Sequence, residues 1–164
     1  EKYFASAQAN YKINKKHSAL FVYGEYDRNR FSGFDYQYTA ALGYSDRLFT
    51  NDNSHFAYSV GPGYTVDQPE SPEDADKEDN FIVRLSLEYV YKFSDHAKFT
   101  QNVSSNYATD TDKNTKTKSV SAVTANLNSS LSLRMSYTLE HNSEVVDGRE
   151  HADTETAATI VYSF

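Results

Sequence analysis

The chain has 164 residues, a formal net charge of −7 and no cysteine, so it is long enough for one domain and carries neither a disulfide framework nor a thiolate metal site. The acidic balance argues against nucleic-acid binding, and no stretch is long and apolar enough for a transmembrane helix. Tyrosine occurs 14 times and phenylalanine 10 times. Tyrosine suits the headgroup depth of a membrane, although a soluble β-sandwich can also be rich in it.

The first third of the chain alternates apolar and polar side chains with a period of two. Segments 3–13 and 34–44 show this alternation, and 18–28 shows it more weakly; it is the side-chain period of a β-strand. In the third segment, the apolar side chains between Phe34 and Tyr44 alternate with smaller or polar neighbours. We therefore expect three strands here, each with one apolar face.

The middle of the chain contains the clearest strand pattern, in segment 81–93. One face is entirely apolar with aromatic ends, and it consists of Phe81, Val83, Leu85, Leu87, Tyr89, Tyr91 and Phe93. The opposite face includes arginine, serine, glutamate and lysine, which fits lipid outside and a polar interior. Segment 56–66 alternates in the same way, and its Pro62 lacks an N–H group, which predicts a bulge or a strained strand.

Four further strands are expected in the last third of the chain. Segments 98–108 and 118–128 alternate weakly, whereas 131–140 repeats the strong pattern. The last twelve residues, DTETAATIVYSF, have apolar side chains on one face and end in an aromatic residue. Such a terminal amphipathic strand is typical of the closing strand of a bacterial outer-membrane β-barrel. Nine strands and no helix are therefore predicted.

The connections between the predicted strands alternate in length. The short ones are 15–17, 50–54, 94–97 and 128–130, and the longer ones are 29–33, 67–80, 109–117 and 142–152. Outer-membrane barrels have short periplasmic turns and longer external loops. The last strand would then end at the periplasm, and residue 1 would lie at the external end of its strand.

An odd number of strands does not fit a bacterial barrel that has both termini in the periplasm, and open sheet edges are not tolerated in hydrocarbon. We therefore predict an all-β, antiparallel transmembrane β-barrel, with about nine strands visible as part of a larger, even-stranded barrel. Residues 1–164 would form this single domain, and any export signal would have been removed. A soluble antiparallel sandwich is the alternative fold.

Three segments and the C-terminal strand resemble a known family. The segments are RFSGFDYQYTAALGY (30–44), GPGY (61–64) and LSLRMSYTLEHNSE (131–144). In this order they resemble the salt-induced outer-membrane protein family, a Gram-negative family of unknown function, over nearly the whole chain. The resemblance implies further N-terminal strands ahead of residue 1. It implies no catalytic residue or ligand, because none is established for the family.

The polar strand faces supply candidate lumen charges, which are Arg84, Glu88, Lys92, Arg134, Glu140 and Glu155, with Lys12, Glu25 and Asp35 on further strands. Buried charges must pair or stay hydrated, so we expect Arg134 to pair with Glu155 or Glu140 across strands. Two interpretations stay open: a salt-bridged plug, and a narrow pore whose charges select solutes. The aromatic girdle or lipid face is predicted at Tyr89, Tyr91, Phe93, Tyr137, Tyr162 and Phe164.

Two charged segments are weaker candidates for binding. The acidic segment 67–80 could hold Ca²⁺ or Mg²⁺ through oxygen ligands, but it has no EF-hand spacing, and a solvated loop is the alternative. Lys113, Lys116 and Lys118 are expected at the external rim. There they could contact lipopolysaccharide phosphates or form a solubilising patch.

The histidines are the candidates for an enzymatic site. His141 and His151 flank a long connection that contains Ser143, Glu144 and Asp147, so an acid–His or Ser–His pair is conceivable there. No nucleophile elbow, phosphate loop or metal signature is present. We therefore expect no enzymatic activity, no cofactor and no metal.

The function expected from these patterns is that of an integral barrel of the Gram-negative outer membrane, either a porin-like pore for small solutes or an envelope-stress protein. The first alternative is a structural or partner-binding barrel with a plugged lumen, and the second is an enzyme that uses external loop residues. Expected partners are the lipid bilayer, lipopolysaccharide, the barrel-assembly machinery through the C-terminal strand, and another chain that supplies missing strands. No nucleic acid is expected.

Overall fold

The computed structural model describes residues 2–13, 17–29, 34–69, 78–110, 113–128, 130–145 and 150–162. Within these ranges the chain forms one antiparallel sheet of nine strands, each paired with its neighbour in sequence. The strands are β1 (Lys2–Lys12), β2 (Ala19–Asn29), β3 (Phe34–Thr50), β4 (Ser54–Pro69), β5 (Glu78–Ser94), β6 (Ala97–Ala108), β7 (Lys116–Asn126), β8 (Leu131–Asn142) and β9 (Ala152–Tyr162). The nine predicted strands are confirmed.

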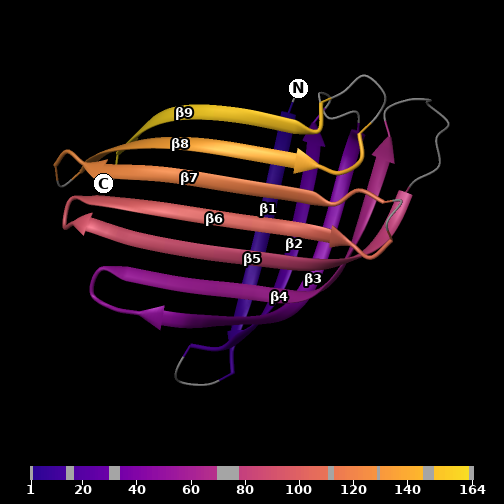
Figure 1. The fold of residues 1–164 in the computed structure, drawn as a ribbon, viewed down its shortest axis with the longest axis horizontal. Helices are drawn as coiled ribbons and strands as arrows, with labels where there is room; N and C mark the ends of the chain where they lie inside the picture. Colours follow the sequence, from indigo (N-terminus) through magenta and orange to yellow (C-terminus); the bar gives the residue numbers. More distant parts are fainter. Residues whose placement is uncertain are drawn as a thin grey trace.

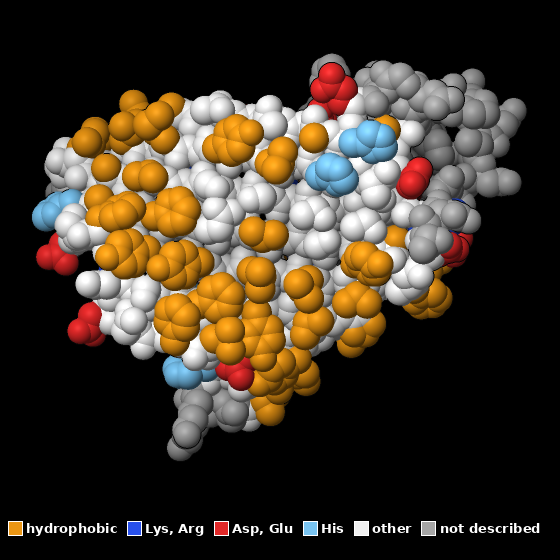
Figure 2. Space-filling model, in the orientation of Figure 1, with side chains coloured by type: hydrophobic (Ala, Val, Ile, Leu, Met, Phe, Trp, Pro, Cys, Tyr) orange, Lys and Arg blue, Asp and Glu red, His pale blue; other side chains and the backbone are white. Residues whose placement is uncertain are grey.

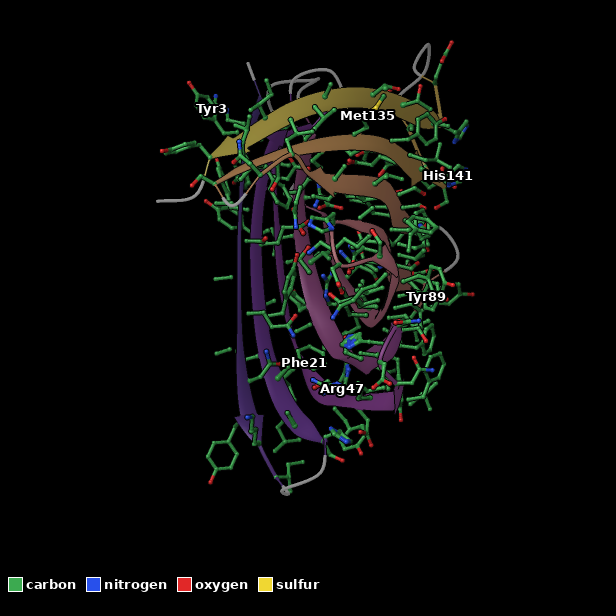
Figure 3. All side chains as sticks on the ribbon, turned by 90° about the vertical axis from the view of Figure 1, so that its left-hand side faces the viewer. Tyr3, Phe21, Arg47, Tyr89, Met135 and His141 are labelled. Atoms are coloured by element: carbon green, nitrogen blue, oxygen red, sulfur yellow. The ribbon has the colours of Figure 1, made fainter. Side chains whose placement is uncertain are left out.

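The sheet curls into a half-barrel. Figure 1 shows β1 to β3 crossing behind β5 to β9, so that the two ends of the sheet face each other. Figure 3, which looks roughly along β6 to β9, shows the same curl, with β1 to β3 seen lengthwise. In the described part of the chain, β1 pairs only with β2, and β9 pairs only with β8. The sheet therefore has two edges.

The register gives the sheet one apolar and one polar face, as the alternation predicts. The convex face carries the large exposed apolar side chains, among them Tyr3, Leu42, Phe81, Leu85, Val123, Met135 and Ile160. Figure 2 shows such side chains spread over the convex side of β4 to β9, with the acidic side chains mainly near the margins. The concave face carries the buried polar and charged side chains, including Asp27, Gln37, Arg84, Asn106 and Glu140.

Several strands are longer than predicted, because the pairing continues beyond the clear alternation. β3 runs to Thr50 through an irregularity between Arg47 and Phe49, where the apolar pattern changes phase. Of the two alternatives predicted at Pro62, the bulge does not form toward β5, where β4 stays in register through the Pro62–Val83 pair. Toward β3 the pairing is interrupted between the Ala41–Gly63 and Tyr44–Val60 pairs. The alternation of connection lengths holds from β3 onwards but not for the first two connections, residues 13–18 and 30–33.

β3 and β4 lie unusually close together at two glycines of the concave face. A Cβ atom on Gly61 would lie 2.0 Å from the backbone oxygen of Leu42, and one on Gly43 would lie 2.3 Å from that of Val60. Gly43 also leaves room for the ring of Phe21, which is 1% exposed. Phe21, Tyr23 and Ala41 form a small apolar cluster there. The absence of side chains at the two glycines thus permits the two strands to approach this closely.

Among the described residues, no helix is long and apolar enough to cross a membrane.

Candidate functional site

A polar cluster of the described residues crosses the concave face between β2 and β7. The Lys116 ammonium lies 2.6 Å from the Asp27 carboxylate and 3.2 Å from that of Glu140. Lys118 lies 3.4 Å from the other Glu140 oxygen. Asp27 and Lys116 are 89 residues apart in sequence, so this cluster, which we call the Lys116 network, joins opposite walls of the half-barrel.

A second contact crosses the same space beside the Lys116 network. The Arg84 guanidinium stacks over the Tyr23 ring, 3.5 Å from its centroid, and donates a hydrogen bond to Asn106 at 2.7 Å. Stacking of this kind combines cation–π attraction with desolvation of the planar group. The Tyr23 hydroxyl donates to Glu25 on the same strand. Arg84 of β5 is thereby held against β2.

Little space remains around these two contacts. The cavities lined by Glu25, Asn106 and Lys116 measure only about 10 and 20 Å³, and a water molecule needs about 10–15 Å³. The concave face is therefore filled toward the end of the sheet that carries the long connections after β4, β6 and β8.

The opposite end of the concave face is open and polar. A cavity of about 330 Å³ lies over β1 and β3 to β6, and Gln8, Arg47, His55, Ser59 and Glu88 are among the residues that line it. His55 Nε2 lies 2.9 Å from the Glu88 carboxylate. Figure 3 looks into this end of the half-barrel, with Phe21 and Arg47 near its lower part.

A second open cavity, of about 380 Å³, lies at the same end over β5 to β9. Its lining includes Lys92, Lys98 and Arg134, together with Asp95 and several hydroxyl groups. The register places Lys92 opposite Lys98, Lys98 opposite Thr124, and Thr124 opposite Arg134. The three cations therefore form one row across the concave face.

The predicted lumen charges lie on the concave strand faces, but their partners differ from those expected. Arg134 lies opposite Thr124 and Thr159 in the register, not opposite Glu155 or Glu140. The predicted pairing of Arg134 is therefore wrong. Glu140 instead binds Lys116 and Lys118, and Glu155 is exposed opposite Thr138. The side chain of Asp35 lies outside the described residues.

The predicted aromatic residues lie on the convex strand faces. Tyr91 and Phe93 contact each other with ring centroids 5.4 Å apart, and Tyr89 lies 6.5 Å from Phe56 of the neighbouring strand. Tyr137 and Tyr162 are exposed. Phe164 lies outside the described residues.

Of the three predicted rim lysines, Lys113 lies in the connection between β6 and β7, but the other two do not form a free cationic patch. Lys116 and Lys118 point to the concave face, where acidic side chains bind them, because their even positions on β7 share the parity of its inner residues. Most of the acidic segment, residues 70–77, lies outside the described residues, and Asp79 accepts a hydrogen bond from Tyr64. The described residues include no group of three or more potential metal ligands.

His141 and His151, each considered for an acid–His or Ser–His pair, stack on each other, with ring centroids 6.3 Å apart. His151 Nδ1 lies 3.0 Å from the backbone oxygen of Asn142, and the Ser143 hydroxyl accepts the Thr115 N–H. Among the residues described, neither histidine is hydrogen-bonded to Ser143 or Glu144. Asp147 lies outside this set.

Sequence reasoning missed Asp27, Asn106 and Lys98 as site residues. Asp27 and Asn106 share the parity of inward neighbours that were recognised on the same or the adjacent strand, so extending the alternation would have found them. The contact between Asp27 and Lys116 is different in kind. It depends on how sharply the sheet curls, and pairing of neighbouring strands does not determine that curvature.

Comparisons with known proteins bear on these features. A family model described as a protein of unknown function, DUF481, matches residues 1–164. The uncharacterized protein YdiY of Escherichia coli (strain K12) is 30% identical over 165 residues, which cover 99% of this chain and 62% of that protein. The chain thus spans less than two thirds of the length of this curated relative. No solved structure matches the chain. The match along its whole length shows that the chain belongs to the DUF481 family, whose function is unknown.

Proposed function

We propose that this chain forms the wall of a β-barrel in the outer membrane of a Gram-negative bacterium. The observation that carries the proposal is the exposure of large apolar side chains along the convex face of every strand. Soluble monomers rarely expose contiguous apolar patches of more than a few hundred Å². Lipid on the convex face would account for this surface, because barrels alternate apolar side chains outward and polar ones inward.

The polar side chains on the convex face also fit contact with lipid. Several of them lie on β6 and β7, where Gln101 donates to Ser119 at 2.9 Å and accepts from Ser121 at 2.5 Å. Ser105 and Thr117 are 2.9 Å apart and bind each other. Hydrocarbon offers polar groups no partner, so groups that face it must be satisfied within the protein. These pairs meet that requirement.

Membrane insertion would require further strands. The edges of β1 and β9 carry backbone groups that no described strand pairs, and such edges are not tolerated in hydrocarbon. We propose that strands of a longer polypeptide, or of another chain, close the barrel. The greater length of the E. coli relative is compatible with the first arrangement.

A barrel with a plugged lumen is supported better than an open pore. The Lys116 network and the Arg84–Tyr23 contact both cross the concave face, and only small voids remain beside them. An ion pair held between opposite walls blocks solute passage as long as it persists. We therefore propose a lumen that is closed toward the long connections and open toward the short ones, which lie on the periplasmic side in barrels of this kind.

Two experiments test the two parts of the proposal. Expression of the full-length protein with its export signal, followed by sucrose-gradient separation of the two membranes, should place it in the outer-membrane fraction. Recovery in the soluble fraction would refute membrane insertion. The purified protein should give no conductance steps in planar lipid bilayers, whereas regular steps without denaturant would refute the plug and favour the small-solute pore.

Enzymatic catalysis receives no support from the geometry of the described residues. The two histidines near the last long connection stack on each other, and His151 contacts a backbone oxygen rather than a nucleophile.

A further inference from the structure

We propose that Lys92, Lys98 and Arg134 form an anion-binding site on the concave face, and that this site takes a small soluble molecule carrying a phosphate group. The site lies in the cavity of about 380 Å³ at the end of the short connections. This volume falls within the range of roughly 300–1,000 Å³ that is usual for small-ligand pockets.

The first argument is the placement of the cations. Lys92 and Lys98 are directly opposite each other on β5 and β6, and like charges in such positions destabilise a sheet. Arg134 extends the row two strands further, on β8. Neighbouring strands are about 4.8 Å apart, so the row spans about 14 Å of backbone from β5 to β8. Long lysine and arginine side chains can converge within this span on one phosphorylated ligand. An anion between them would remove the repulsion.

The second argument is that protein carboxylates do not neutralise this row. Among the residues the structure describes, no ion pair involves Lys92, Lys98 or Arg134, whereas Lys116 and Lys118 on the same face are both paired. Among the described residues of the cavity lining, Asp95 is the one that carries a carboxylate. The chain as a whole carries a net charge of −7, so the row is not a sample of a generally basic surface.

The third argument is the chemistry of the remaining lining. Ser94, Thr124, Asn126 and Ser132 supply hydroxyl and amide donors beside the cations. Ser132 donates to the Asn126 oxygen at 2.9 Å, which leaves the Asn126 amide protons free to point elsewhere. Phosphate has several acceptor oxygens, which bind lysine as a point charge and arginine through paired N–H groups. A cation row flanked by neutral donors therefore matches phosphate better than a neutral sugar.

The position of the site favours a soluble molecule over a lipid headgroup. The cavity belongs to the concave face, and the apolar surface that would contact lipid belongs to the convex face of the same strands. Which side of a membrane the site faces depends on the proposed function, but binding itself does not. A failure to bind pyrophosphate would therefore not refute membrane insertion, and recovery of the protein in the soluble fraction would not refute anion binding.

The test is isothermal titration calorimetry of the full-length protein in detergent, with pyrophosphate as the probe and acetate as the monoanion control. Pyrophosphate should bind and acetate should not. K98Q and R134Q should each weaken binding about tenfold, the effect of losing one charge-assisted hydrogen bond. R47Q is the matched control, because Arg47 is an exposed cation that lines the other cavity at the same end, and its binding should equal that of the wild type.

A second measurement does not depend on the variants. Pyrophosphate should protect Lys92 and Lys98 from acetylation by an amine-reactive ester, read by mass spectrometry, while exposed Lys12 stays reactive. Absence of pyrophosphate binding to the wild type, equal weakening by R47Q, or equal acetylation with and without pyrophosphate would each overturn the proposal. Binding to phosphatidylglycerol vesicles without binding of free pyrophosphate would also overturn it, because the phosphate would then be that of a lipid.

Discussion

Replacing Lys116 with glutamine tests whether the Lys116 network holds the two walls of the half-barrel together. The substitution removes the charge that lies between Asp27 and Glu140. It leaves two nearly buried carboxylates without their shared cation, since the Asp27 side chain is 3% exposed and that of Glu140 is 10% exposed. One Asp27 oxygen already has no hydrogen-bond partner. Loss of the Lys116 ammonium would therefore leave this buried carboxylate even less compensated.

The size of the effect follows from burial. Removing one partner of a buried ion pair costs about 3–5 kcal/mol, and we expect K116Q to lower the free energy of unfolding by about that amount. K118Q is the matched control on the same strand. Lys118 is 30% exposed and makes one contact with Glu140 at 3.4 Å, so its loss should cost about 1 kcal/mol or less. D27N combined with K116Q should recover part of the loss, because the uncompensated charge at Asp27 disappears.

The assay is urea unfolding of the protein in detergent or lipid vesicles, followed by the circular dichroism of the sheet. K116Q should also admit ions in planar bilayers if the network is the plug. A loss of stability for K116Q no larger than that for K118Q, together with an unchanged bilayer record, would refute this account of the lumen.

Two further predictions concern the shape and the surface of the sheet. G61A and G43A should each destabilise the fold by about 1–3 kcal/mol in the same unfolding assay, since a Cβ atom would overlap the neighbouring backbone. G24A is the control, because its Cβ atom would meet nothing within 4 Å, and it should change stability little. Equal effects at the three positions would contradict the close approach of β3 and β4. L85R should cost about 2–4 kcal/mol in lipid vesicles if Leu85 faces the hydrocarbon, whereas S86R on the opposite face should cost clearly less, and a reversed order would contradict the assignment of faces.

The strands and their faces could be predicted from the sequence because both depend on local alternation. Segment 81–93 is the clearest example, and its inner and outer residues are those that the structure places on the two faces. Antiparallel neighbours and the strand count followed from the same pattern and from the connections. The extra length of β3 was missed because the alternation changes phase between Arg47 and Phe49.

Partners across the concave face could not be predicted in the same way. Arg134 was expected to bind an acidic residue of its own or a neighbouring strand, but the register sets it opposite two threonines. Glu140 forms an ion pair with Lys116, which also pairs with Asp27 on a strand that is not adjacent. Such contacts follow from the curvature of the whole sheet, to which residues such as Gly43 and Gly61 contribute through a missing side chain.

The central claim of the proposed function is that lipid covers the apolar convex face. Cysteine accessibility tests this claim most directly. The chain contains no cysteine, so single cysteines can be placed at Leu85 and Leu133 on the convex face and at Ser86 and Ser132, which line the two open cavities of the concave face. A charged, water-soluble thiol reagent is then supplied on both sides of proteoliposomes. We predict rapid labelling at Ser86 and Ser132, and labelling at Leu85 and Leu133 only after unfolding in urea. Equal labelling of all four positions in the folded protein would show that water, not lipid, covers the convex face.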